Sequence, residues 1–564
     1  MKKRWVAKAV ADENLFQALK QQIQTTDVLL HLIAQRNLQN LQEAHTYFQP
    51  DISQLHCPFL MQDMDKAVLR LQKAFDAGEK IVIYGDYDVD GTTSVALVYS
   101  FIKSFYNNVV FYIPDRFKEG YGISLTGIDW AEQQGASLIV ALDCGIKSIE
   151  QVAYATEKNI GFIICDHHTP GESLPEAVAI LNPKRADCNY PYKELSGCGI
   201  GFKLIQALGE KLAINFSKEE YLDLVAVSIA SDIVHMTGEN RILAYFGLKR
   251  INSKPRPGLQ ALIELSGHKK DLAINDLVFR IGPRINAAGR ISSATLAVEM
   301  LVEKDIAKAH QIAAAINKNN TDRQSVDQII TRQAMEMIEN HKNTKPKTTV
   351  LFDKDWHKGV IGIVASRLIE KHYRPTVLLT ESNGYAVGSA RSVAGFDLYN
   401  AIKQCDDLLD QWGGHQAAAG LTMSLDKVDA FREKFESIVA ATIEEEMLTP
   451  VIEYDLELSL HDVTFTFCRS IERFGPFGPE NMRPVFITRN VQCVSQPRIV
   501  GNNHLQLTIV DENGISHRAI GFGFGDIYEK FENNPVFDIC YTVDINEFRG
   551  TKSINLNIKD IHFD

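Results

Sequence analysis

Short apolar segments alternate with longer amphipathic stretches from about residue 80 to residue 181. Five of the apolar segments have the length and composition of buried strands: 80–84, 109–113, 137–143, 161–166 and 178–181. The stretches between the first of these segments follow a helical pattern that begins near Thr93, Ser124 and Ile146. This alternation is typical of βαβ units, so it predicts a parallel sheet with helices on both of its faces.

The pattern changes along the rest of the chain and divides it into five parts. Residues 1–60 are mostly helical and irregular in pattern, and residues 61–302 contain the predicted parallel sheet. Residues 303–345 have the pattern of one long, largely polar helix of about 40 residues and roughly 60 Å, which is typical of a link between two domains; we expect a bend at 319–321. Glycine-rich segments mark residues 346–448. Five or six strand-like segments in 449–564 fit a small all-β barrel such as an OB-fold.

Composition limits the class of protein. A chain of 564 residues is too long for one hydrophobic core and suggests about three or four domains. The formal net charge of −12 argues against a passive basic coat for nucleic acid, but it is compatible with a nucleic-acid enzyme whose carboxylates hold cations. The nine cysteines form no C-x-x-C pair, so neither a zinc knuckle nor a disulfide framework is indicated. No apolar run approaches the roughly 18 residues of a membrane span, and we expect a soluble, cytoplasmic protein.

Three carboxylates follow the first predicted strand at every second position: Asp86, Asp88 and Asp90. Like charges in one short loop repel each other unless a cation lies between them. Taken alone, the segment is equally compatible with a metal-binding loop and with an Asp/Gly turn in which Asp90 caps the next helix.

Two later strands end in the same kind of residue. Asp143 follows the third predicted strand, and Asp166, His167 and His168 follow the fourth. The carboxyl ends of parallel strands face the ligand crevice of such a sheet. A single Asp or His after a strand is usually a turn or structural residue, but three clusters at one end of one sheet favour a shared site.

A further carboxylate comes from a predicted helix with apolar spacing from Leu222 to Val234. Asp232 would interrupt the buried face of this helix, and a buried unpaired carboxylate needs a cation or a strong hydrogen-bond donor. Asp223 is the competing candidate, but it lies near the helix start, where a carboxylate favours the helix dipole. We therefore prefer Asp232 as the ligand.

Carboxylates with one or two imidazoles suit Mn²⁺ or Mg²⁺, and the histidines favour Mn²⁺. One carboxylate shared among several others suggests two ions, which is the usual device for activating water in phosphoryl transfer. The chemistry that these residues predict is phosphoester hydrolysis.

Arginines and glycines mark candidate phosphate contacts. The segment 279–293 places Arg284 and Arg290 among small residues in what we interpret as a phosphate-binding loop, with surface arginines in a turn as the alternative. In 346–448, Ser389 and Arg391 lie in a glycine-rich segment, and His415 is a plausible polar contact in another. Residues 450–564 hold 16 Asp and Glu against 10 Lys and Arg, so nucleic-acid binding there would need local stacking platforms such as Phe474, Phe477 or Phe522.

The motifs resemble those of a known superfamily. The segments GDYDVDG, ALDCGI, CDHH and SIASDIV resemble, in order and spacing, the four motifs of the DHH phosphoesterases. The segments IPDRFKEGYG, GPRINAAGR, WHKGVIGIVASRL and GGHQAAAG resemble those of the RecJ branch of bacterial exonucleases. The resemblance covers the chain from about residue 60. It implies an α/β DHH catalytic domain, an α/β DHH-associated domain joined to it by the long helix, and a C-terminal OB-fold.

The same resemblance implies 5′-to-3′ degradation of single-stranded DNA with Mn²⁺ or Mg²⁺, in recombination and repair. It also implies a monomer that works with a single-stranded-DNA-binding protein and a RecQ-type helicase. The alternatives are a phosphodiesterase for short oligonucleotides or cyclic dinucleotides, against which the extra barrel argues, and a non-catalytic scaffold. A scaffold would not need the clustered acidic and histidine residues.

The resemblance also assigns roles to single residues. Asp86, Asp88 and Asp143 would hold one ion, and Asp90, Asp143, His167 and Asp232 the other. His168 would contact the scissile phosphate and Asp166 would orient the histidines. Arg116, Ser389 and Arg391 match positions that hold the DNA 5′ end, and Arg284 and Arg290 match positions near the nucleic-acid track. Many relatives carry a histidine where this chain has Tyr84, so we expect the first ion to bind more weakly than the second.

Overall fold

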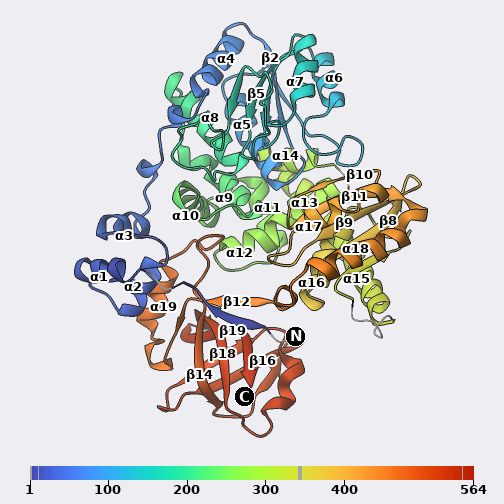
Figure 1. The fold of residues 1–564 in the computed structure, drawn as a ribbon. Coiled ribbons are helices and arrows are strands. Elements are labelled where there is room, and N and C mark those ends of the chain that lie inside the picture. The colour runs from blue at the N-terminus through green and yellow to red at the C-terminus, as the bar shows by residue number, and fades with distance from the viewer. Residues whose placement is uncertain (1–2, 10–11, 292, 341–345, 549, 564) are drawn as a thin grey trace. The chain divides into compact units, whose positions relative to one another are not determined.

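The computed structural model describes residues 3–9, 12–291, 293–340, 346–548 and 550–563. The end of the predicted long-helix part, 341–345, therefore lies outside the described residues. The chain divides into two compact units (Figure 1). One comprises Met1–Val6 and Lys318–Ile452, and the other comprises Ala7–Asn317 and Glu453–Asp564. We call them the small unit and the large unit.

The large unit contains the predicted parallel sheet. Its five strands lie in the order β3-β2-β4-β5-β6, and every neighbouring pair is parallel. The strands are β2 (Lys80–Gly85), β3 (Val109–Tyr112), β4 (Ala136–Leu142), β5 (Gly161–Cys165) and β6 (Ala179–Leu181). All five predicted strands are confirmed to within two residues at each end, because each is a continuous apolar run that both faces of the sheet bury.

Alternate residues of these strands enter two separate hydrophobic clusters. Ile81 and Ile83 of β2 pack with helices on one face, whereas Val82 and Tyr84 pack on the other. The first face is covered by α4 (Met64–Asp76), α5 (Val89–Lys103) and α8 (Gly197–Lys211), and the second by α6 (Leu125–Gln133) and α7 (Ile149–Glu157), as Figure 1 shows. The candidate carboxylates follow the carboxyl ends of β2, β4 and β5, between the two helical layers.

A helical region follows the sheet. It consists of α9 (Leu222–Ser231), α10 (Gly238–Ser253), α11 (Pro257–Leu265), α12 (Ile274–Asp276), a π-helical turn (Leu277–Ile281), α13 (Gly282–Ile291) and α14 (Thr295–Val302). The sequence prediction of a loop at 279–293 is therefore wrong for residues 279–291, which are helical. The glycines of this segment permit close helix packing: a Cβ on Gly282 would lie 2.7 Å from Ser231 Oγ, and one on Gly289 would lie 3.0 Å from the Tyr87 carbonyl.

Asp223 has a different role from the predicted one. It is fully buried, and Arg256 binds both of its oxygens, through Nη2 at 2.8 Å and Nε at 3.0 Å. The carboxylate therefore forms a buried ion pair rather than only favouring the dipole of α9, because Arg256 reaches it from the segment before α11.

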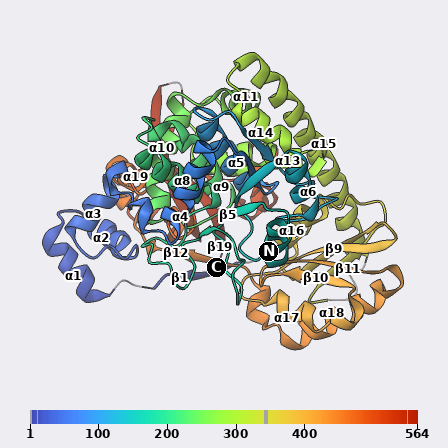
Figure 2. The same cartoon turned by 90° about the horizontal axis from the view of Figure 1, so that it is seen from above.

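The small unit holds a mixed sheet with the order β10-β11-β9-β8-β7. Its elements are β7 (Thr349–Phe352), α16 (Ile361–Lys371), β8 (Thr376–Ser382), β9 (Tyr385–Arg391), α17 (Leu398–Lys403), β10 (Gln411–Gly414), β11 (Ala418–Ser424) and α18 (Val428–Thr442). Helices α17 and α18 cover one face, and α16 covers the other (Figure 2). Helix α15 (Ile306–Asn340) contributes residues to both units and runs through 319–321 without the expected break.

The C-terminal part of the large unit is a barrel-like sheet in the order β13-β14-β18-β19-β17-β16-β15, with an added pairing of β14 with β16. Its strands are β13 (Leu456–Glu457), β14 (Phe486–Cys493), β15 (Arg498–Val500), β16 (His504–Val510), β17 (Ser516–Gly521), β18 (Phe537–Phe548) and β19 (Thr551–Phe563). Helix α19 (Phe465–Glu472) precedes β14, and the short strand β12 (Val451–Tyr454) pairs with β1 (Arg4–Ala7). This domain matches the expected small β-barrel.

The N-terminal helices α1 (Glu13–Gln22), α2 (Asp27–Ala34) and α3 (Leu41–Phe48) do not form a core of their own. Phe16, Leu19 and Leu30 enter the same hydrophobic cluster as the barrel. Phe474 lies in this cluster with 1% of its surface exposed, so it cannot be a stacking platform. Phe477 is half-buried beneath Arg483, at 4.6 Å, whereas Phe522 is 60% exposed. In the described part of the chain, no helix is both long and apolar enough to span a membrane.

The Asp223–Arg256 pair should contribute strongly to stability. Replacing Asp223 by Ala would leave a guanidinium largely buried without its counter-charge, and we expect a loss of about 3–5 kcal/mol in the free energy of unfolding. Urea unfolding would measure it. As a control, Asp129→Ala should cost far less, because Asp129 is a partly exposed carboxylate that pairs with Lys158 at the surface. Equal losses for the two variants would contradict the structural role of Asp223.

Candidate metal centre

The carboxylates gather where neighbouring strands end. Asp86 directly follows β2, Asp143 follows β4, and Asp166 follows β5, and these three strands are adjacent in the sheet. All three side chains are buried. The sequence prediction that these strand ends form one cluster is therefore confirmed in its geometry.

Helix α5 begins inside the first acidic motif. Its N-cap is Asp88, whose Oδ1 accepts a hydrogen bond from Gly91 N at 2.9 Å. The expected cap, Asp90, lies instead in the first turn of the helix. Gly91 is required here because a Cβ would lie 2.3 Å from the Asp86 carbonyl oxygen. The motif is thus a tight turn that directs its carboxylates to different places.

Asp90 faces the start of another helix. Its carboxylate accepts hydrogen bonds from Gly197 N at 2.7 Å and Cys198 N at 2.8 Å, in the first turn of α8, and from Ser228 Oγ at 2.7 Å. Amide groups at a helix N-terminus favour a negative charge. These three donors hold the Asp90 side chain in place while its Oδ2 lies 3.7 Å from His167 Nε2.

Asp143 has the most constrained position. It has a left-handed backbone (φ 60°), and a Cβ on Gly197 would lie 2.7 Å from its own Cβ. Its Oδ1 is buried, has no hydrogen-bond partner and lies 3.2 Å from His167 Nε2. Burial, followed by the charges of Asp90 and Asp88, raises the pKa of Asp143 well above its usual value. A cation beside this carboxylate would offset the repulsion from Asp90 and Asp88.

The two histidines are held differently. His168 Nδ1 lies 2.6 Å from Asp166 Oδ1, and Asp166 Oδ2 accepts a hydrogen bond from Ile146 N at 2.9 Å. Burial by itself would raise the pKa of Asp166, but these hydrogen bonds and the His168 charge lower it below its usual value. An ionised Asp166 thus orients the His168 ring. Both ring nitrogens of His167, by contrast, are buried without a hydrogen-bond partner.

Asp232 follows the last residue of α9 and does not interrupt the buried face of that helix, contrary to the prediction. The helix ends at Ser231, and the Asp232 side chain is 28% exposed, with Oδ2 3.5 Å from His167 Nε2. Burial, then the charges of Asp90 and Asp88, raise its pKa to about 8. Asp232 rather than Asp223 joins the cluster, as preferred from the sequence.

These residues fit a divalent cation. The ligand atoms of Asp90, His167 and Asp232 all lie within 4.8 Å of one another, and so do those of Asp143, His167 and His168. Asp86 Oδ2 is another buried oxygen without a partner, and burial together with Asp88 raises the pKa of Asp86 to about 8. A set of unpartnered carboxylate oxygens and imidazole nitrogens suits Mn²⁺ or Mg²⁺. Asp86 and Asp88 belong to neither of the two close groups, although they adjoin them.

Tyr84, at the position where the family resemblance implied a histidine, offers no ligand to the cluster. Its ring is fully buried on the helix-covered face, beside Tyr112. Its hydroxyl donates to the Gly122 carbonyl and accepts from Ser124 N, both at 3.1 Å. Gly122 N in turn donates to Asp86 Oδ1 at 3.3 Å. Tyr84 therefore anchors the loop that contacts Asp86.

That loop carries Tyr121, a residue that the sequence reasoning missed. Its hydroxyl lies 3.1 Å from His168 Nε2, and its ring meets Tyr87 edge to face. The sequence signal was the glycine on each side of Tyr121; in the structure both glycines have positive φ. Arg116 lies over the Tyr87 ring at 4.9 Å, so this candidate for the DNA 5′ end lies beside the acidic motif.

The two candidate arginines of α13 differ. Arg290 lies close enough to Tyr87 to lower the pKa of its hydroxyl, against the larger raising effects of burial and Asp86. Arg284 donates to Asn317 Oδ1 at 3.0 Å and to the Arg280 carbonyl, which ties it to neighbouring helices. Only Arg290 is brought towards the acidic motif.

The small unit places Ser389 and Arg391 together on β9. Arg391 Nη1 donates to Ser389 Oγ at 2.9 Å, and both side chains lie against Gly362 in the first turn of α16. A Cβ at Gly362 would lie 2.8 Å from Ser389 Oγ and 2.9 Å from Arg391 Nη2. A hydroxyl, a guanidinium and a helix N-terminus together suit an anion. His415 lies in the exposed turn between β10 and β11.

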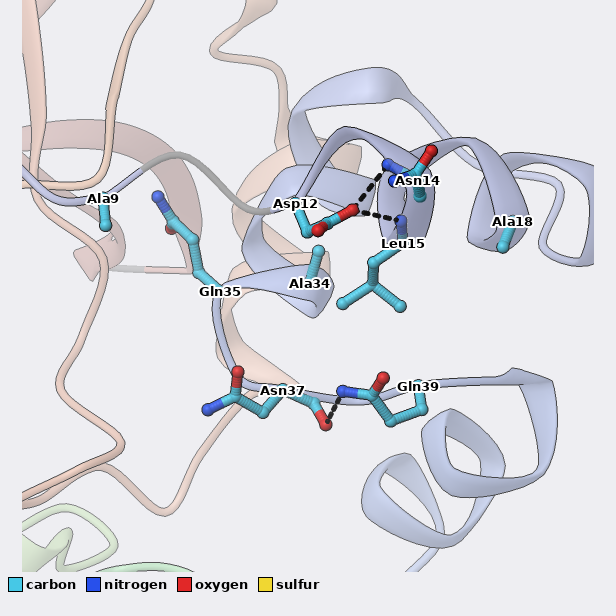
Figure 3. Close-up of a pocket in the computed structure, with 9 residues that line it drawn as sticks. All are labelled: Ala9, Asp12, Asn14, Leu15, Ala18, Ala34, Gln35, Asn37 and Gln39. Atoms are coloured by element: carbon cyan, nitrogen blue, oxygen red, sulfur yellow. Dashed lines mark hydrogen bonds between the residues drawn. The ribbon is translucent and has the colours of Figure 1, made fainter.

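A surface hollow elsewhere in the structure lacks the residues of the candidate metal centre. A hollow of about 690 Å³ lies among the N-terminal helices (Figure 3). Small and amide side chains line it, with one carboxylate, Asp12, whose Oδ1 caps α1 through Asn14 N and Leu15 N. Its lining residues include no histidine, lysine or arginine, so nothing there suits phosphoryl transfer.

Three family models match the chain. Residues 80–229 match the DHH family N-terminal domain, residues 343–441 the DHHA1 domain, and residues 454–560 the RecJ OB domain. The single-stranded-DNA-specific exonuclease RecJ of Bacillus subtilis is 36% identical over 99% of this chain and 71% of its own length. That of Salmonella typhimurium is 34% identical over 89% of this chain and 90% of its own length.

Solved structures agree with these matches. RecJ of Thermus thermophilus in complex with Mn²⁺ has a TM-score of 0.84 and 25% identity, over 99% of this chain and 79% of that one. A structure of the same protein with Mg²⁺ has a TM-score of 0.78 and 24% identity, over 99% and 78%. The acidic cluster at the strand ends, the three matched domains and full-length relatives above 30% identity lead to one conclusion: the chain belongs to the RecJ family of DHH-type exonucleases.

Proposed function

We propose that this RecJ-family exonuclease hydrolyses single-stranded DNA from the 5′ end, uses two Mn²⁺ or Mg²⁺ ions and releases 5′-mononucleotides, in recombination and repair. The observation that carries the proposal is the set of buried, unpartnered metal-type ligand atoms on Asp86, Asp143 and His167. A bound ion pair would activate water and stabilise the charge that develops on the phosphoryl group.

The chain's own residues prepare the site for this reaction. Asp86, Asp88 and Asp143 would hold one ion, and Asp90, Asp143, His167 and Asp232 the other. The hydrogen bonds from α8 and Ser228 hold the Asp90 side chain so that its Oδ2 lies 3.7 Å from His167 Nε2. Asp166 holds the His168 ring through Nδ1, so that Nε2 is left for an oxygen of the scissile phosphate. In the substrate-free chain the Tyr121 hydroxyl lies at that nitrogen.

Each unit, taken by itself, offers arginines that are candidates for binding phosphate groups of DNA. In the small unit, Ser389 and Arg391 beside the first turn of α16 form a site of suitable chemistry for a terminal phosphate. In the large unit, Arg116 lies beside the acidic motif, and Arg290 approaches it from α13. We assign Arg284 a packing role and leave His415 as a candidate contact to DNA.

The other functions explain less of the chain. A phosphodiesterase for short oligonucleotides or cyclic dinucleotides would not need the C-terminal barrel with its match to the RecJ OB domain. A non-catalytic scaffold would have no use for buried carboxylates whose pKa is raised to about 8, because such groups destabilise a protein that binds no cation.

We further propose a division into a helical segment (1–60), a catalytic domain (61–302), a connecting helix (303–345), a DHH-associated domain (346–448) and an OB domain (449–564). Family resemblance also supports a cytoplasmic monomer that cooperates with single-stranded-DNA-binding protein and a RecQ-type helicase. Light scattering of the purified chain would test the monomer, and co-purification would test the two partners.

Replacing Asp143 by Asn should abolish cleavage of a labelled single strand while the protein stays folded. The raised pKa of Asp143 means that the folded state binds a proton more tightly than the unfolded state does. Its charge therefore destabilises the metal-free fold increasingly as the pH rises above about 4. The variant should accordingly melt at a higher temperature than the metal-free wild type at pH 8 and gain less from Mn²⁺. Retained cleavage would overturn the shared-ligand assignment.

The end preference tests the small-unit site. Arg391→Gln should reduce the preference for a 5′-phosphorylated over a 5′-hydroxyl strand by about tenfold or more, because a guanidinium–phosphate contact contributes about 1.5–3 kcal/mol. Arg432→Gln, at a partly exposed arginine of α18 that pairs with Asp429, is the matched control and should leave the end preference unchanged. Digestion of a strand whose 5′ end is blocked would contradict the polarity.

The two ions should differ in affinity. Tyr84 points away from the site and supplies no ligand, so the ion held by Asp86, Asp88 and Asp143 has fewer protein ligands than the other. Calorimetric titration of the full chain with Mn²⁺ should therefore resolve a tighter and a weaker class. Two equally tight sites would contradict this assignment.

A further inference from the structure

A loop of the C-terminal barrel domain reaches the segment that follows Asp232. We call residues 474–482 the barrel loop. Its Pro479 carbonyl accepts a hydrogen bond from Met236 N at 2.8 Å. Met236 is buried, and Gly478 packs on it so closely that a Cβ there would lie 3.0 Å from Met236 Cβ. The barrel loop thus contacts Met236, which lies four positions after the proposed metal ligand Asp232.

The barrel loop is itself rigidly held. Asn481 is 3% exposed, and its Nδ2 donates to the carbonyls of Phe474 at 3.0 Å and Pro476 at 2.9 Å. Its Oδ1 accepts from Arg36 Nε and from the Tyr47 hydroxyl, both at 2.9 Å. These hydrogen bonds cross-link the barrel loop internally and attach it to the N-terminal helices. Its conformation is therefore fixed without its contact to Met236.

The catalytic domain contributes a second attachment. Arg241 of α10 is 4% exposed and donates to the Gly475 carbonyl at 2.7 Å, while its guanidinium lies 3.7 Å from the centre of the Tyr47 ring. The barrel loop is therefore seated on the same helical region that carries the turn after Asp232.

That turn contains an unfavourable backbone conformation. Ile233, directly after Asp232, has φ 58°, and its side chain is 63% exposed. Left-handed backbone is a true outlier for a β-branched residue. An exposed side chain has no packing that could compensate for it, so the conformation must be imposed by the attachments on either side. On one side this is α9, through Asp232 N to the Ser228 carbonyl at 2.9 Å. On the other side the His235 carbonyl accepts hydrogen bonds from Asn240 Nδ2 at 3.0 Å and from the Tyr192 hydroxyl at 3.2 Å, and the Met236–Pro479 bond follows.

We infer that the barrel loop is a positioning element for the metal centre: by holding Met236 it keeps the turn at Ile233 left-handed and Asp232 directed at His167. The inference rests on the proposed role of Asp232 as a metal ligand. It makes the affinity for the ion held by Asp90, His167 and Asp232 depend on the seating of the C-terminal domain. Because coupling is reciprocal, binding of that ion should also stabilise the seated loop.

The test uses the full chain and Mn²⁺ alone, with free Mn²⁺ measured by electron paramagnetic resonance. Gly478→Val crowds Met236 from the barrel side, far in sequence from every proposed ligand. We expect it to weaken one of the two Mn²⁺ ions about tenfold and to leave the other within twofold. Gly521→Val, which crowds Phe524 in the same domain, is the matched control and should weaken neither.

A second substitution separates positioning from general damage. Asn adopts the left-handed conformation far more readily than Ile, so Ile233→Asn should make the turn independent of its anchor. In that background, Gly478→Val should change the affinity for either ion by less than twofold. Hydrogen exchange of the metal-free chain should also show that 232–237 opens faster in Gly478→Val than in the wild type. If the valine prevents folding of the barrel, Gly478→Ala should weaken the same ion by less.

The outcomes are distinguishable. Equal weakening of both ions, no weakening in a folded variant whose 232–237 segment opens, or a loss that Ile233→Asn does not reduce would each overturn the inference. Asp232→Asn tests the underlying assignment. If this variant binds both ions like the wild type, the proposed ligand role of Asp232 fails. If it loses one ion while Gly478→Val loses none, only the role of the barrel loop fails.

Discussion

Repulsion among buried carboxylates is the constraint on which the rest of this structure depends. Two unit charges 4 Å apart interact by about 4 kcal/mol near a protein surface and by more in the interior. Asp86, Asp143 and Asp232 all have a raised pKa because burial and neighbouring carboxylates act in the same direction. A fold can keep such a cluster only if its backbone holds each carboxylate in place until a cation arrives.

The structure meets this constraint with donors placed behind the cluster. The first turn of α8 and Ser228 hold Asp90, Ile146 N and the His168 ring hold Asp166, and Gly122 N holds Asp86. At Asp86 this bond satisfies one oxygen and leaves Oδ2 without a partner, so that it is available to an ion. Strained or crowded backbone occurs at the same places, at Asp143, Ile233 and Gly91, as expected for a functional site.

Support for the site also comes from parts of the chain that carry no ligand. Tyr84 supplies no ligand, but it anchors the loop that places Tyr121 beside His168. The barrel domain reaches the turn after Asp232, although a strand-binding domain need not touch the catalytic centre at all. In the proposed arrangement, the C-terminal domain supports the turn that carries Asp232.

Local patterns predicted much of this, and they failed where a residue's surroundings mattered. Continuous apolar runs located the five strands, and the rule for parallel sheets brought Asp86, Asp143 and Asp166 together. Gly282 and Gly289 suggested a loop, but they allow helices to pack closely. Glycine occurs both in loops and at close helix contacts, so its presence alone does not distinguish the two. Phe474 looked like a stacking platform because burial cannot be read from a single aromatic residue.

By itself, the sequence determined which residues end the strands, because apolar runs and the side-chain period are local properties. It thereby also indicated which side chains could share an ion, since the carboxyl ends of parallel strands meet at one edge of a sheet. Only the tertiary structure decided that Asp88 rather than Asp90 caps α5. It also decided that Asp223 pairs with Arg256 and therefore cannot be a metal ligand, and that Met236 is bonded to Pro479. Each of the last two contacts joins segments that are distant in the chain, and the identity of Asp90's partners depends on where α8 begins in space. No pattern in the residues around these side chains could contain that information.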